Sequence, residues 1–151
     1  MYEIKVFDIG RLNDVLLFEE SLQRQEPKTY YWTIDDEYIS SVKNSFINDK
    51  FKDSLSLLAY EGGSVVGRID TTLIASHFDG SLKAYLDWIC VLKSHRHKGV
   101  AQMLMSAARC ELKKIGAEAI IGIIANNEEA MRFYRKLPDA SIKDEGIWIT
   151  I

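Results

Sequence analysis

The stretch from Lys83 to Ala125 constrains the fold most, because three different apolar patterns follow one another within it. Lys83 to Leu92 has the composition of a strand. Val100 to Lys113 places apolar side chains on one helical face and polar ones on the other, and Gly116 provides a stop. Ala119 to Ala125 is almost wholly apolar, so it predicts a central strand buried on both faces. A strand, a helix and a second strand in this order predict a parallel crossover unit.

The rest of the chain predicts a sheet that is antiparallel before this unit and helices that flank it. Two-residue alternation and turn residues such as Asp79-Gly80 predict an edge strand, a meander and a closing hairpin, at Tyr2–Phe7, Leu55–Tyr60, Val65–Ile74, Ala140–Lys143 and Ile147–Ile151. Helical spacing predicts helices over Arg11–Arg24, from Asp35 through Ile47, and from Asn127 to a stop at Pro138. The fold class is therefore α/β with a mixed, antiparallel-then-parallel sheet. No linker or repeat interrupts residues 1–151, which predicts a single domain.

Charge and cysteine usage limit the classes of partner. A net charge of -3 gives no general attraction to nucleic acid or to an anionic membrane, so neither is expected as a partner. Cys90 and Cys110 form no CxxC pair, which indicates neither a disulfide framework nor a zinc site. No apolar run approaches the roughly 18 residues of a membrane span, and the first residues do not resemble an export signal. We therefore expect a cytoplasmic protein without a metal.

A basic loop joins the strand that ends at Leu92 to the helix that starts near Gly99. It reads Lys93-Ser94-His95-Arg96-His97-Lys98 and is the most basic stretch of an acidic chain. A helix N-terminus presents unpaired N–H groups, and glycine lets a phosphate approach the backbone. Charge alone favours a solvated connecting loop, whereas the strand, loop and helix together favour an anion site. The Walker and the dinucleotide Rossmann patterns are both absent.

Two segments carry a resemblance to a known family. Arg96-His97-Lys98-Gly99-Val100-Ala101 resembles the Arg/Gln-x-x-Gly-x-Gly/Ala segment of the GNAT acetyltransferase superfamily, and residues 127–134 resemble the family's Asn-x-x-Ala-x-x-Phe-Tyr helix. The resemblance implies a GNAT-like acyl-CoA N-acyltransferase fold. It also implies an N-acetyltransferase that uses acetyl-CoA, with the pyrophosphate bound by Arg96, His97, Lys98, Gly99, Val100 and Ala101, and the pantetheine arm bound by the main chain of Ile89 and Val91 and by Asn127. Asn127 is explained equally well as a helix cap.

Acyl transfer to an amine needs an unprotonated amine, a stabilised oxyanion and a proton for the leaving thiolate. The resemblance implies that Tyr134 is the proton donor, although its spacing also fits a packed core stripe. Asp87 is the candidate base; it could equally pair with a cation, and a water relay needs no base. Backbone N–H groups near Cys90 and Val91 could stabilise the oxyanion if the strand bulges there. A nucleophilic Cys90 is disfavoured, because no histidine is near and apolar strand cysteines are usually inert.

In the family the acceptor enters against the first two helices, here roughly Leu22 to Asp36. Aromatic and acidic residues gather there, which favours a cationic small-molecule or peptide amine, although they also fit a helix start with aromatic packing: Glu26, Tyr30, Tyr31, Trp32, Asp35, Asp36 and Glu37. Pro138-Asp139 replaces the family's common Gly-Phe, so the acceptor wall is the part of the site that the resemblance constrains least.

Family members often form dimers, which allows a homodimer here. A non-catalytic acyl-CoA-binding regulatory module and a nucleic-acid-binding domain are the alternatives, and the net acidity disfavours the second.

Overall fold

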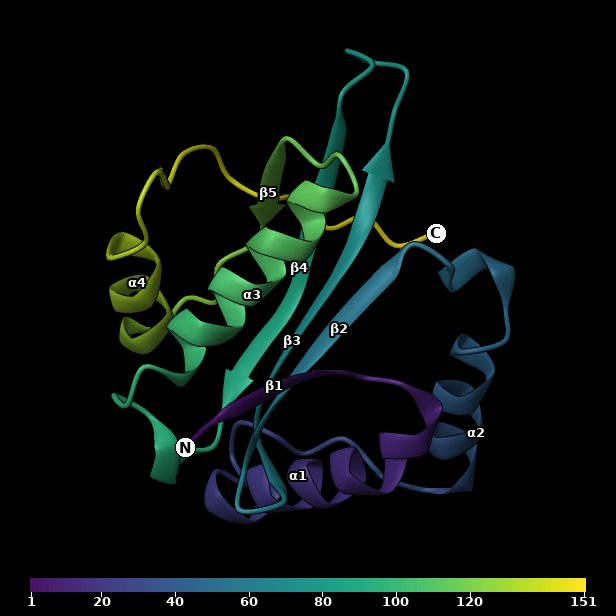
Figure 1. The fold of residues 1–151 in the computed structure, drawn as a ribbon, viewed down its shortest axis with the longest axis vertical. Helices are drawn as coiled ribbons and strands as arrows, with labels where there is room; N and C mark the ends of the chain where they lie inside the picture. Colours follow the sequence, from purple (N-terminus) through teal and green to yellow (C-terminus); the bar gives the residue numbers. More distant parts are fainter. The chain divides into compact units, whose positions relative to one another are not determined.

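The computed structural model describes all residues from Met1 to Ile151, in two compact units (Figure 1). The first unit spans Met1–Ile121 and the second spans Gly122–Ile151. The helices and strands, with three short 3-10 turns named η, are β1 (Glu3–Val6), η1 (Ile9–Arg11), α1 (Leu12–Gln25), α2 (Asp36–Ser45), η2 (Asp49–Phe51), β2 (Ser54–Glu61), β3 (Ser64–Ala75), β4 (Leu82–Val91), η3 (Lys93–His95), α3 (Val100–Lys114), β5 (Ala119–Gly122) and α4 (Glu128–Arg135).

The strands form one sheet in the order β1-β2-β3-β4-β5, and the first four are antiparallel neighbours. β1 is at one edge, as its alternating sequence predicts. β4 and β5 run in the same direction on either side of the α3 crossover (Figure 1). The mixed sheet with flanking helices confirms the predicted fold class, and the meander and the helices up to α3 lie where the sequence predicts them.

Helices α1 and α3 cover opposite faces of the sheet. A Cβ placed on Gly67 of β3 would lie 3.0 Å from Val100 and 3.1 Å from Leu104 of α3. The next residue, Arg68, reaches Glu19 of α1 with its Nη1 3.1 Å from Oε1. Successive residues of a strand point to opposite faces, so the two helices lie on opposite sides of β3.

The α3 face of the sheet is apolar and closely packed. The apolar stripe predicted for this helix is buried, with Leu104 and Ala108 fully covered, and the paired residues Leu57 and Ile69 of the sheet are buried as well. The α1 face differs, because the charged residues Arg68 and Asp70 of β3 lie on it. The buried charges of β3 therefore lie on this second face.

The prediction that Ala119–Ala125 is a central, buried strand is wrong. β5 has only four residues, Ala119–Gly122, it is last in the sheet order, and none of its residues is buried. An apolar run predicts burial only if elements cover both of its faces, and β5 has a strand partner on one side alone.

The second unit contains α4 and no strand beyond Gly122. Asn127 caps α4 as predicted, because its side chain accepts a hydrogen bond from the N–H of Ala130 at 2.8 Å. The predicted hairpin of Ala140–Lys143 and Ile147–Ile151 is absent, since residues 140–151 form neither helix nor strand. An isolated two-stranded hairpin is marginally stable, and this unit supplies no third strand to pair with it.

No helix in the structure combines the length and the apolar character needed to cross a bilayer. The prediction of a single domain over residues 1–151 stays a prediction.

We expect Gly67→Ala to lower the free energy of unfolding by about 1–3 kcal/mol, because the added methyl group would press against Val100 and Leu104. Chemical denaturation of the two proteins measures this difference. Val100→Ala removes one of the opposing groups, so the double variant Gly67→Ala/Val100→Ala should lose less stability than the sum of the single losses. Additive losses would show that β3 and α3 are not in close contact at Gly67.

Candidate active site

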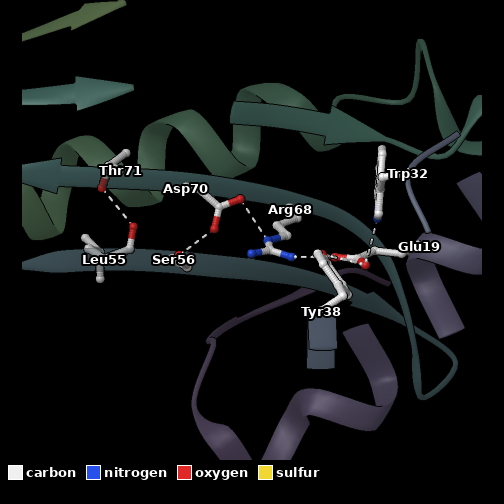
Figure 2. Close-up of polar contacts among 8 residues, drawn as sticks. All are labelled: Glu19, Trp32, Tyr38, Leu55, Ser56, Arg68, Asp70 and Thr71. Carbon is white, nitrogen blue, oxygen red and sulfur yellow. Dashed lines mark hydrogen bonds and ion pairs between the residues drawn. The ribbon is translucent and has the colours of Figure 1, made fainter. Parts of the chain in front are cut away.

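A charged network on the α1 face of the sheet centres on Arg68 of β3 (Figure 2). Its Nη1 lies 3.1 Å from Glu19 Oε1, and its Nε lies 2.8 Å from Asp70 Oδ2. All three side chains are at least 85% shielded from solvent, with exposed fractions of 15% for Arg68, 2% for Glu19 and 14% for Asp70. One cation therefore neutralises part of the charge of two buried carboxylates, as burial of charge requires.

Glu19 connects this network to the segment that follows α1. The hydroxyl of Tyr38 on α2 donates to Glu19 at 2.9 Å, and the indole Nε1 of Trp32 donates to it at 3.4 Å. Burial raises the pKa of Glu19 although Tyr38 and Arg68 both lower it, and burial followed by the charge of Glu19 raises the pKa of Tyr38. Figure 2 shows Tyr38 and Trp32 converging on the same carboxylate from different elements.

Strand β2 supplies hydrogen-bond partners to two polar residues of β3. The Ser56 hydroxyl donates to Asp70 Oδ1 at 2.6 Å, and these two residues are register partners across β2 and β3. The Thr71 hydroxyl donates to the carbonyl of Leu55 at 2.8 Å. The network is thus held by ion pairs between its own members and by hydrogen bonds between β2 and β3, which fix the positions of its side chains.

A cavity of about 1120 Å³ opens beside this network. It lies between the segment from α1 to η2 and the strands β2, β3 and β4. Its lining combines aromatic rings with charged groups, among them Trp32, Tyr38, Trp88, Glu19, Asp49, Asp70, Asp87, Lys50, Lys52 and Arg68. A large concave site with a few polar groups fits a small-molecule or peptide ligand.

A β-bulge in β4 places Asp87 on this cavity. Asp70 pairs with Trp88 and Thr71 pairs with Leu86, so Asp87 is an extra residue in β4. A bulge interrupts the two-residue alternation of side chains, and the neighbours Asp87 and Trp88 both line the cavity. Asp87 is exposed and forms no ion pair, so the alternative of pairing with a neighbouring cation does not occur in this structure. The bulge near Cys90 and Val91 that backbone stabilisation of the oxyanion would require is absent, since Gly67 to Asp70 pair regularly with Val91 to Trp88.

Three aromatic rings pack together near the end of β4, and one of them contacts Cys90. Tyr30, Trp32 and Trp88 contact one another edge to face, with ring centroids 5.9 to 6.4 Å apart. The Tyr30 hydroxyl lies 3.2 Å from Cys90 Sγ. Burial raises the pKa of the Cys90 thiol to about 11, so the thiolate needed by a nucleophile is scarce at neutral pH. This environment supports the expectation that Cys90 is not a nucleophile.

The predicted anion loop ends on a left-handed glycine at the start of α3. Gly99 has φ +83° and His97 has φ +60°, and α3 begins at Val100. A Cβ built on Gly99 would meet no atom within 4 Å, so space for a phosphate lies over the backbone there. Lys98 folds back to donate from Nζ to the Ser94 carbonyl at 3.0 Å. The first turn of the helix contains no acidic side chain that would repel an anion.

Arg96 does not extend freely from this loop. Its Nη1 and Nη2 donate to the two carboxylate oxygens of Glu26 at 3.0 and 2.6 Å, and its Nε donates to the Val91 carbonyl at 3.2 Å. The preceding His95 lies 2.9 Å from Glu61 through Nε2. Two of the loop's basic side chains are therefore committed to carboxylates within the protein.

The main chain of Ile89 and Val91 turns away from β3. Leu92 donates its N–H to Val66 of β3, whereas the Val91 carbonyl accepts from Arg96. Since main-chain groups alternate in direction along a strand, those of Ile89 and Val91 point to the β5 side. β5 pairs near the start of β4, where Glu118 donates to Leu82, so it leaves the Ile89–Val91 end without a strand partner.

Tyr134 belongs to α4 in the second unit. Its ring contacts that of Phe133 with centroids 5.1 Å apart, and burial raises the pKa of its hydroxyl above the ordinary value of a phenol. The hydroxyl is therefore protonated at neutral pH, as a proton donor must be.

The sequence reasoning missed Glu19, Arg68, Asp70, Tyr38 and Trp88. The available signal was in β3, where Arg68 and Asp70 interrupt an otherwise apolar strand at a spacing of two, so both point to one face. Charges inside a covered strand mark a partnered site. No group of three or more His, Cys, Asp and Glu side chains has the arrangement of a metal site.

Comparison with known proteins identifies the family. Residues 15–137 match the model of the acetyltransferase (GNAT) family. No curated protein sequence matches the chain. Among solved structures, an aminoglycoside acetyltransferase from an uncultured soil metagenomic sample, in complex with sisomicin, is similar with a TM-score of 0.82 at 14% identity, over 99% of this chain and 96% of that one.

Two further structures are similar over nearly their whole lengths. AAC(6')-Iy in complex with the bisubstrate analogue CoA-S-monomethyl-acetylneamine has a TM-score of 0.77 at 16% identity, over 100% of this chain and 98% of that one. The ribosomal-protein-alanine N-acetyltransferase of Brucella melitensis biovar Abortus 2308 has a TM-score of 0.74 at 15% identity, over 100% and 99%. These likenesses concern the fold. Because the family model spans most of the chain, the protein belongs to the acetyltransferase (GNAT) family and is an N-acetyltransferase.

Proposed function

We propose that the protein transfers the acetyl group of acetyl-CoA directly to a primary amine of a small molecule or peptide, within a ternary complex. The observation that carries this proposal is the bulge at Asp87. It presents a carboxylate without an ion pair to a cavity of about 1120 Å³, on the same strand whose end exposes main-chain groups.

The residues present fit the cofactor. The open space over Gly99 and the N-terminus of α3 suit a pyrophosphate, which the main chain of residues 96–101 would bind, with Lys98 adding positive charge. The main-chain groups of Ile89 and Val91 would hold the pantetheine arm, and Asn127 would assist it in addition to capping α4. When bound, acetyl-CoA supplies an activated acetyl thioester.

The acceptor would bind in the cavity beside Asp87 and Trp88. Of the residues expected to form this wall, only Trp32 lines the cavity, whereas Asp35 caps α2 by accepting from the N–H of Tyr38. Glu19 and Asp70 share the charge of Arg68. Asp49 in η2 and Asp87 in β4 are the other carboxylates of the lining. We assign the attraction of the ammonium group to Asp87, because the exposed main-chain groups lie on its own strand, and the aromatic rings provide faces for the cation.

In the reaction, Asp87 would accept the proton that the acceptor ammonium must lose, directly or through one water. Tyr134 would donate a proton to the departing sulfur, which its raised pKa permits. Direct transfer needs no protein nucleophile, in agreement with the buried, high-pKa thiol of Cys90.

The thiols of Cys90 and Cys110 are both free, which supports a reducing compartment such as the cytoplasm. A homodimer stays a prediction from the family resemblance.

Calorimetric titration with acetyl-CoA and with CoA tests the cofactor site. We expect micromolar binding to the wild type, and at least about tenfold weaker binding to Gly99→Val, because a side chain would fill the space for the phosphate. Gly80→Val is the matched control, since Gly80 also has positive φ (+72°) and open space but lies in the β3–β4 turn. Absence of binding by folded wild-type protein would refute the proposed function.

Replacement of Asp87 by Asn tests the base. We expect Asp87→Asn to lower kcat/KM for an amine identified by screening by about 10²- to 10⁴-fold, without changing CoA affinity. Asp49→Asn removes another carboxylate from the cavity lining and should retain nearly full activity. Equal activity of Asp87→Asn and the wild type would leave the water relay as the explanation.

Replacement of Tyr134 by Phe tests the acid. We expect kcat to fall by about 10²-fold or more in Tyr134→Phe, and the wild type to show no loss of activity from Tyr134 ionisation below about pH 10, because burial raises its pKa. Tyr31→Phe, which removes a hydroxyl from an exposed side chain, is the control. Unchanged kcat in Tyr134→Phe would show that Tyr134 is not the acid and that its ring only packs within the protein.

A further inference from the structure

Glu26 connects the end of α1 to the predicted cofactor loop. Its N–H donates to the Leu22 carbonyl at 2.9 Å, and its own carbonyl accepts from the N–H groups of Thr29 and Tyr30, both at 3.0 Å. Its backbone is thereby fixed on both sides. Its carboxylate faces the loop and accepts hydrogen bonds from both terminal nitrogens of Arg96.

All three guanidinium nitrogens of Arg96 donate hydrogen bonds within the protein. Two nitrogens form the fork with Glu26 and the third donates to Val91, so the guanidinium spans the end of β4, the loop and the end of α1. The exposed fractions of the two side chains are 22% and 18%. A bidentate pair that is this shielded is stronger and more directional than a surface ion pair.

Two neighbouring contacts join the same segments. Gln25 accepts from the Ser94 N–H at 3.3 Å and donates to the Ser94 hydroxyl at 3.4 Å. Tyr30 contacts Cys90 through its hydroxyl at 3.2 Å. The segment from Gln25 to Tyr30 is therefore attached to β4 and to the loop at three places.

The loop needs such support because its backbone is strained. His97 is a non-glycine residue at φ +60°, and Gly99 follows at φ +83°. Left-handed conformations of this kind persist only where the surroundings hold them. Arg96, which is fixed by Glu26, directly precedes His97.

We propose that Glu26 is a positioning residue for the cofactor: through Arg96 it holds the main chain of residues 96–99 in the conformation that binds the diphosphate. This inference rests on the proposed function. On this proposal, the Arg96 guanidinium holds the loop in place and does not contact the phosphate. Arg96 contributes to cofactor binding through its main chain alone.

The test compares the CoA dissociation constants of Glu26→Gln, Arg96→Gln, Arg96→Lys and the charge exchange Glu26→Arg/Arg96→Glu by calorimetry. We expect each single variant to bind CoA on the order of tenfold more weakly. Arg96→Lys is expected to lose affinity although it keeps the charge, because lysine cannot form the fork. The charge exchange should regain part of the loss.

A guanidinium that contacts phosphate directly would give the opposite pattern. Glu26→Gln would then bind CoA as well as the wild type or better, Arg96→Lys would retain most of the affinity, and the charge exchange would bind least. Any of these three results would overturn the proposal. Absence of CoA binding by the wild type would instead refute the proposed function itself.

Leu112→Ala separates positioning from a general loss of stability. This variant should be less stable than the wild type but should bind CoA with unchanged affinity, since the buried Leu112 lies at the opposite end of α3 from Gly99. Steady-state kinetics adds a second readout, in which Glu26→Gln raises KM for acetyl-CoA and leaves kcat nearly unchanged. A Glu26→Gln variant that loses only stability, with unchanged KM, would also contradict the proposal.

Discussion

The ion pairs of Arg68 with Glu19 and Asp70 hold together the elements that form the cavity. Arg68 comes from the middle of the sheet, Glu19 from α1, and Glu19 in turn holds Tyr38 of α2 and Trp32 of the intervening segment. Removing one partner of such a shielded network would leave an uncompensated charge, which costs about 3–5 kcal/mol. The opposite face of β3 needs no such network, because apolar contacts with α3 stabilise it. One strand thus separates an apolar face from a charged one.

The bulge in β4 brings Asp87 to this polar face. In a regular strand, Asp87 and Trp88 would point to opposite faces, and only one of them could reach the cavity. The extra residue allows both to line it, a carboxylate beside an aromatic ring. Farther along the same strand, regular pairing returns and turns the main chain of Ile89 and Val91 toward the β5 side. The same strand therefore presents a carboxylate to the cavity through its bulge and, where its pairing is regular, main-chain groups to the β5 side.

The antiparallel meander and most element positions could be predicted from the sequence, because they depend on local periodicity and turn chemistry. The alternation before Leu92, the stripe of Val100 and Leu104, and the Asn127 cap all have local causes, and each lies where it was predicted. The family followed from two short motifs, and the match over residues 15–137 confirms it. The Ala119–Ala125 strand and the final hairpin were predicted wrongly, because their burial and pairing depend on neighbours that an apolar pattern does not identify.

The sequence by itself thus determined an α/β acetyltransferase fold, because local periodicity and short motifs mark its elements. It also determined the glycine at the start of α3, because the left-handed backbone at Gly99 favours that residue. Only the tertiary structure decided which charged groups meet. Glu26 and Arg96 are far apart in the chain, as are Glu19 and Arg68, yet each pair forms a shielded contact. The bulge at Asp87 likewise depends on the register between two strands and not on the residue itself. Long-range pairing selects the partner of a charge, and no local pattern encodes that choice.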